Sequence, residues 1–92
     1  MTTKEKIMKI IALAVSIEPT ATRFITLDYS GGRDRVSIYV FSSHGIVENF
    51  DYYADREDLY CSYDDAIRKL TDIKNNMDAE RNVKSAGVKS SV

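Results

Sequence analysis

The sequence predicts an α+β fold of two layers, in which two helices cover one face of a three-stranded antiparallel sheet, in the order α-β-β-β-α. Three observations predict this fold. Apolar residues recur at helical spacing over residues 3–17, alternate with polar residues over residues 23–53, and recur at helical spacing again over residues 62–82. Helices and sheets that are apolar on one side must cover each other, so the 92-residue chain is expected to form a single domain over residues 1–82.

The first helix is expected over residues 3–17. Thr2 and Glu5 have the spacing of a capping box, and Glu18-Pro19 supplies the stop, because the residue before proline avoids the α region. Its apolar stripe contains Ile7, Ile10, Ile11, Ala14 and Ile17. The apolar run of residues 10–17 is far too short to cross a membrane, so no membrane partner is expected.

Three strands should follow, over residues 23–29, 35–41 and 46–53. Gly31 and Gly32 are expected to take positive φ in the first turn, and residues 42–45 carry a second turn signal. Alternation predicts which side chains face the helices: Ile25, Leu27, Tyr29, Val36, Ile38, Val40, Ile46, Phe50 and Tyr52.

Residues 54–61 are expected to form a loop, because they carry many acids and no helical stripe. Ser62 then resembles an N-cap, followed by Asp64 and Asp65 in the first turn of a second helix. The stripe of that helix contains Ala66, Ile67, Leu70, Ile73 and Met77, and its end is expected near Asn82. Residues 83–92 are small and polar, which favours a flexible tail.

The other face of the sheet is expected to lie open. It would carry Phe24, Tyr39 and Phe41 together with Thr26 and Ser37. Three aromatic side chains on an open face are more apolar surface than a monomer normally exposes, so a homodimer face is one interpretation. The alternative is that these aromatic residues only stabilise the sheet through cross-strand pairs.

Composition and charge exclude some classes of function for this chain. With 13 basic and 14 acidic residues the net charge is −1, which excludes a strongly basic nucleic-acid binder. One cysteine and one histidine give neither a disulfide nor zinc-ligand spacing, so the sequence predicts a reducing cytoplasm and no metal or other cofactor. His44 and Cys61 share no local motif, and no enzyme activity is expected.

Acidic residues are concentrated in one segment. Residues 48–65 hold seven carboxylates and Arg56 as the one basic residue, so the remainder of the chain carries the balancing positive charge. Carboxylates interleaved with tyrosines suit a surface that docks on a basic nucleic-acid groove of another protein, because carboxylates can replace phosphates. The candidate partner-binding residues are Glu48, Asp51, Tyr52, Tyr53, Asp55, Glu57, Asp58, Tyr60 and Tyr63. A solvated acidic loop with some tyrosines packed inward is the alternative.

Residues 2–82 contain a capped helix, the hairpin of residues 25–40, a stretch rich in tyrosine and aspartate, and a closing helix. Together these elements give the chain a resemblance to a known group of proteins. In size, element order and acidic-aromatic character the chain resembles small accessory proteins of phages and prophages, some of which are anti-CRISPR proteins. This resemblance implies a stoichiometric inhibitor that occupies a nucleic-acid-binding or effector surface of a host defence complex, in the host cytoplasm.

The element order is also similar to that of the double-stranded-RNA-binding domain. The last helix departs from that family, because Asp64 and Asp65 stand where it presents lysines to phosphate. The turn around His44 and the basic tail are the features that still favour RNA. The leading prediction is therefore a protein-binding inhibitor, with a homodimeric structural or regulatory module and an RNA-binding domain as alternatives.

Overall fold

The first helix begins at a capping box. The computed structural model describes the backbone of residues 1–90 and the side chains of residues 1–82. Helix α1 (Thr3–Ser16) follows Thr2, whose hydroxyl accepts a hydrogen bond from the Glu5 N–H (3.1 Å), while the Glu5 carboxylate accepts one from the Thr2 N–H (3.3 Å). Two otherwise unpaired helix donors are thereby satisfied, as predicted.

The three strands form one antiparallel sheet in the order β1-β2-β3. They are β1 (Arg23–Ser30), β2 (Arg35–Ser42) and β3 (Gly45–Tyr53). A 3-10 turn, η1 (Gly31–Arg33), joins β1 to β2, and the residue with positive φ is Asp34 (φ 47°) rather than Gly31 or Gly32. Aspartate tolerates the left-handed region better than most residues, so the turn closes after the glycines and not on them. In the second turn Gly45 has φ 109°, which suits glycine.

A β-bulge changes the expected orientation of the third strand. Val40 pairs with Glu48 and Phe41 pairs with Ile46, so Val47 is an extra residue in β3. Because side chains alternate along a strand, this extra residue turns Ile46 to the side of Phe41, where it is 55% exposed. The prediction that Ile46 faces the helices is therefore wrong, whereas the inward positions of Phe50 and Tyr52 are confirmed.

The second helix is longer than predicted. Ser62 caps it through a hydrogen bond that its hydroxyl accepts from the Asp65 N–H (3.1 Å), and α2 runs over Tyr63–Ser90. It continues past Asn82, and residues 83–90 contain no proline that would stop it. Residues 91–92 of the expected tail lie outside the described residues.

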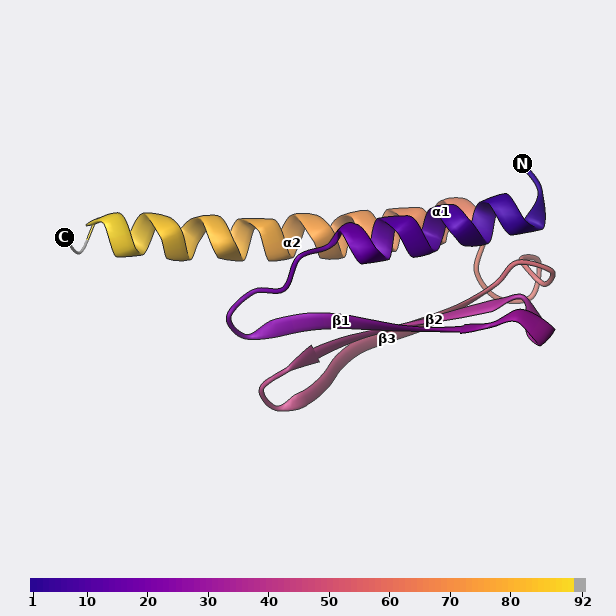
Figure 1. Cartoon of the computed structure of the whole chain (residues 1–92), viewed down its shortest axis with the longest axis horizontal. Coiled ribbons are helices and arrows are strands. Elements are labelled where there is room, and N and C mark those ends of the chain that lie inside the picture. The colour runs from indigo at the N-terminus through magenta and orange to yellow at the C-terminus, as the bar shows by residue number, and fades with distance from the viewer. Residues whose placement is uncertain (91–92) are drawn as a thin grey trace.

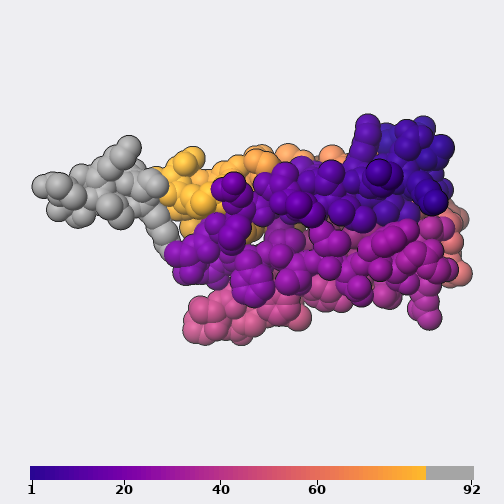
Figure 2. All heavy atoms as spheres, viewed as in Figure 1, coloured from indigo at the N-terminus to yellow at the C-terminus, as the bar shows by residue number. Residues whose placement is uncertain are grey.

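The core lies between the helices and the sheet. Both helices lie on one side of the sheet and run side by side (Figure 1), which confirms the predicted two layers. The buried residues are Ile7, Ile10, Ala14, Ile17, Val36, Ile38, Val40, Tyr52, Cys61, Ala66, Leu70, Ile73 and Met77. Figure 2 shows strand residues along the lower border of the molecule, with the helix atoms above them.

Tyr29 pairs with the buried Val36, so it lies on the predicted side of the sheet, but it is 45% exposed. It lies near the end of the edge strand β1, and its ring lies over Gly31, where an added Cβ would stand 3.5 Å from the Tyr29 hydroxyl. The ring therefore packs on the turn and not under a helix. Within residues 1–90, no helix is both long and apolar enough to cross a bilayer.

Leu70→Ala should lower the free energy of unfolding by about 2 to 5 kcal/mol, because a fully buried side chain is lost and a cavity remains. Leu59 is 68% exposed, and the same truncation there should change the free energy by less than about 0.5 kcal/mol. Urea denaturation of both variants measures the difference, and equal losses would contradict the placement of Leu70 in the core.

Candidate functional site

One half of the open sheet face is an aromatic cluster. The cluster consists of Phe24 on β1, Tyr39 and Phe41 on β2, and Ile46 on β3. Phe24 pairs with Phe41 across the strands, and their rings stack with centroids 5.2 Å apart and an interplanar angle of 7°. The Tyr39 and Phe41 rings are 6.4 Å apart. Phe24 remains 47% exposed, so the structure brings the three predicted aromatic residues together on a solvent-facing surface.

The other half of this face carries charge. Ser37 of β2 pairs with Asp28 on one side and with Asp51 on the other, so two carboxylates flank one buried hydroxyl residue. The next outward residue, Arg35, has its Nη2 atom 3.9 Å from the Asp28 Oδ2 atom. A hydrogen bond to Tyr53, together with the charges of Asp51 and Asp28, raises the pKa of Arg35 above its ordinary value. Arg35 therefore stays positive and offsets one of the two carboxylates.

Glu57 does not belong to a free acidic surface. Its Oε1 atom accepts hydrogen bonds from the Tyr52 hydroxyl (2.5 Å) and the Lys6 Nζ atom (2.9 Å), and its Oε2 atom accepts one from the Tyr63 N–H (3.3 Å). Tyr52 is fully buried, and its ring meets that of Tyr63 edge to face at 6.5 Å. Glu57 thus joins α1, β3 and the start of α2.

These contacts also determine the protonation states of Glu57 and Tyr52. The hydrogen bond from Tyr52, followed by that from Lys6, lowers the pKa of Glu57. Burial, followed by the hydrogen bond to Glu57, raises the pKa of Tyr52. The carboxylate therefore stays ionised and the phenol stays neutral, which suits one hydrogen bond donated by the phenol to the carboxylate.

The nine predicted partner-binding residues therefore do not form one surface. Tyr52, Glu57 and Tyr63 are engaged within the fold. Asp51 and Tyr53 lie on the open sheet face, whereas the exposed residues Asp55, Asp58 and Tyr60 belong to the loop of residues 54–62. Glu48 lies apart from both groups, on the helix side of β3.

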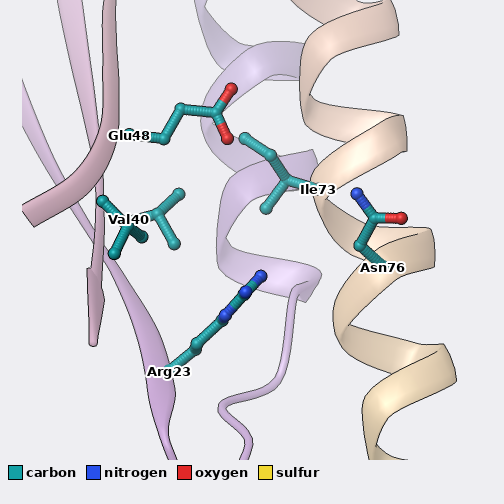
Figure 3. A pocket seen from close by; sticks show the side chains of 6 residues that line it. Arg23, Val40, Glu48, Ile73 and Asn76 are labelled. Atoms are coloured by element: carbon teal, nitrogen blue, oxygen red, sulfur yellow. The ribbon is translucent and has the colours of Figure 1, made fainter. Parts of the chain in front are cut away.

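The surroundings of Glu48 form a small hollow of about 160 Å³ between the sheet and α2. It is lined by Arg23, Val40, Val47, Glu48, Ile73 and Asn76. Figure 3 shows Glu48, Val40 and Arg23 on the strand side, facing Ile73 and Asn76 of α2. Arg23 is already engaged, because its Nε atom lies 3.8 Å from the Glu80 Oε2 atom.

A larger hollow of about 290 Å³ lies at the opposite end of the sheet. It is lined by Gly32, Arg33, Tyr53, Asp55, Arg56 and Tyr60. The Tyr53 and Tyr60 rings stack with centroids 4.6 Å apart and an interplanar angle of 30°. The turn after β1 and the loop after β3 build this site together, which no local sequence pattern indicates.

The structure does not bring His44 and Cys61 together. His44 is exposed in the turn before β3, whereas Cys61 follows the loop at the other end of that strand. Cys61 is buried, and this burial raises the pKa of its thiol, which disfavours the thiolate. In the part of the chain with described side chains, no group of three histidine, cysteine, aspartate or glutamate residues could hold a metal ion.

Comparison of the chain with models of protein families, with curated proteins and with solved structures gives no match. The resemblances to phage inhibitors and to RNA-binding domains therefore stay predictions. Asp64 and Asp65 do stand in the first turn of α2, the place where the RNA-binding family presents lysines.

Glu57→Gln should lower the free energy of unfolding at neutral pH by about 1 to 3 kcal/mol, because the buried hydroxyl of Tyr52 and the ammonium of Lys6 lose a charged acceptor. In the folded protein the pKa of Glu57 lies below its ordinary value, because Tyr52 and Lys6 donate hydrogen bonds to the carboxylate. The carboxylate therefore stabilises the fold above its unfolded-state pKa, and this contribution disappears as the pH falls through the folded-state pKa.

Denaturation of both proteins between pH 7 and pH 3 measures this effect. The difference between wild type and Glu57→Gln should be largest at neutral pH and shrink on acidification. The exposed neighbour Asp58 supplies the control, since Asp58→Asn should change the free energy of unfolding by less than about 0.5 kcal/mol. A constant difference across the pH range would contradict the role of the Glu57 charge.

Proposed function

We propose that the chain is a non-enzymatic protein-binding module that docks through the open face of its sheet. The observation that carries this proposal is the aromatic cluster, in which Phe24 is 47% and Ile46 is 55% exposed, on a face that neither helix covers. Aromatic side chains in an apolar patch with a polar border are the usual centre of a protein–protein interface.

The charges beside the cluster indicate the kind of partner. Asp28 and Asp51 lie on the same face, and Asp55 and Asp58 lie in the adjoining loop. A partner with an apolar centre and basic side chains on one side complements this arrangement. Basic grooves that bind nucleic acid have this character, so a nucleic-acid-handling complex of the host is the proposed target. The chain would inhibit it by occupying the groove, as the resemblance to phage inhibitors implies.

A homodimer is the second candidate, and the stacked pair of Phe24 and Phe41 favours it. This pair and Ile46 form an uncharged patch that a second copy of the same patch could cover. In that case the carboxylates of the other half would take no part in assembly.

Phe24→Ser with Phe41→Ser should reduce capture of the partner from host lysate by about tenfold or more, because the anchoring rings are lost. Asp28→Asn with Asp51→Asn should weaken capture as well, and raising the salt concentration should weaken capture by the wild type. Quantitative mass spectrometry of the proteins retained by each tagged variant measures these effects.

Matched controls are available on the helices. Met8 and Val15 of α1 are 67% and 69% exposed, so Met8→Ser with Val15→Ser removes apolar surface away from the sheet. Asp72→Asn removes one exposed carboxylate charge from α2, also away from the open sheet face. Both controls should capture the partner as the wild type does. Equal capture by the sheet-face variants and the controls would overturn the assignment of this surface.

Sedimentation equilibrium distinguishes the second candidate from the first. A homodimer should dissociate to monomers when Phe24 and Phe41 are both replaced by serine, and Asp28→Asn with Asp51→Asn should leave it intact. A wild-type chain that is monomeric at high concentration would contradict the homodimer and leave the docking of a different partner as the function.

A further inference from the structure

The hollow at the end of the sheet is a built site and not a gap in a loose loop. The Ala54 N–H donates to the Asp34 carbonyl (3.0 Å), which attaches the loop after β3 to the turn after β1. Within the loop, the Arg56 N–H donates to the Tyr53 carbonyl (3.1 Å), and the Tyr60 N–H donates to the Arg56 carbonyl (3.3 Å). These backbone hydrogen bonds hold the lining residues in one arrangement.

Two arginines that form no ion pair line this hollow. All six arginines of the chain lie within the residues whose side chains are described, and four of them form ion pairs: Arg23, Arg35, Arg68 and Arg81. The two without an ion pair are Arg33 and Arg56, and both line the hollow. A pair of unengaged guanidinium groups at one site suits a phosphate, because each offers a planar fork of donors to its oxygens.

An aromatic surface stands beside these cations. Tyr60 is 61% exposed, and one face of its ring is stacked on Tyr53, which leaves the opposite ring face for a ligand. Proteins that bind single-stranded RNA or DNA stack bases on aromatic rings and contact the phosphates with basic side chains, and the same two contacts suit one nucleotide. The carboxylate of Asp55, in the same lining, can accept hydrogen bonds from ribose hydroxyl or base amino groups.

The size of the hollow fits one small ligand. Its volume of about 290 Å³ lies just below the roughly 300 to 1,000 Å³ that is usual for ligand pockets. Gly32 has no side chain, and a Cβ added there would meet no atom within 4 Å. The space at Gly32, next to Arg33, is therefore open.

We propose that this hollow binds a nucleotide, with the phosphate between Arg33 and Arg56 and the base stacked on Tyr60. Asp55 orients the nucleoside by accepting its hydroxyl or amino hydrogens. The nucleotide is either free or the 5′-terminal residue of a single strand, since both present the same phosphate and base. The site goes beyond the proposed protein docking. It shares Asp55 with the docking surface but uses no residue of the aromatic cluster, and Arg33, Arg56 and Tyr60 are not assigned to docking, so variants of these three residues test the nucleotide site by itself.

The test is a titration of the ¹⁵N-labelled chain with adenosine monophosphate, followed by NMR. Saturable shifts should be confined to residues 32–34 and 53–60. Adenosine and inorganic phosphate, added separately, should each bind at least about tenfold more weakly, because each lacks one half of the contacts. Arg33→Gln, Arg56→Gln and Tyr60→Leu should each weaken binding by about tenfold or more.

Arg68→Gln is the matched control, because Arg68 lies on α2 and pairs with Asp65 at 2.6 Å. It should bind adenosine monophosphate as the wild type does. A 5′-phosphorylated hexanucleotide that binds more tightly than the mononucleotide identifies a strand end as the source, and the reverse order identifies the free nucleotide. Absence of saturable shifts, phosphate alone binding as tightly as the nucleotide, or unchanged binding by the Arg33 and Arg56 variants would overturn the proposal.

Discussion

The whole structure depends on one packing constraint: two helices form a single layer, and a single layer covers only one face of a sheet. The apolar stripes of α1 and α2 bury Val36, Ile38 and Val40 of the central strand. Because side chains alternate along a strand, covering these three leaves Tyr39 and Phe41 on the opposite side. The exposed aromatic cluster is therefore a consequence of the fold, because neither helix reaches this face of the sheet.

A second contact determines what the acidic segment can do. Glu57 binds Lys6 of α1, the hydroxyl of Tyr52 and the first backbone N–H of α2, and so fastens the loop of residues 54–62 to three elements. These contacts engage Glu57 and the buried Tyr52 within the fold, together with the backbone of Tyr63. The Ala54 N–H of the same loop donates to the Asp34 carbonyl in the turn after β1, and the Tyr60 ring stacks on Tyr53. Arg33 and Arg56 line the hollow between this turn and this loop.

The features that sequence predicts well are those with a local period. The capping box, both helical stripes, the two turns and the inward set of β2 were all predictable, because each depends on neighbours a few residues apart. The outward turn of Ile46 was not, since the bulge depends on how β3 pairs with β2. Lys6 and Glu57 are separated by 51 positions, and the hollow joins two distant loops. Such contacts leave no periodic trace, so the sequence alone does not indicate that Tyr52 and Glu57 of the acidic segment bind each other within the fold.

The proposed docking surface requires that the aromatic face is open to solvent in the isolated chain. A soluble paramagnetic probe added to a dilute NMR sample measures this exposure, because the probe broadens signals only from atoms that it can approach. We expect strong broadening of the ring signals of Phe24 and Phe41, and none for the buried ring of Tyr52. Protection of Phe24 and Phe41 equal to that of Tyr52 would contradict the open face and with it the proposed docking surface.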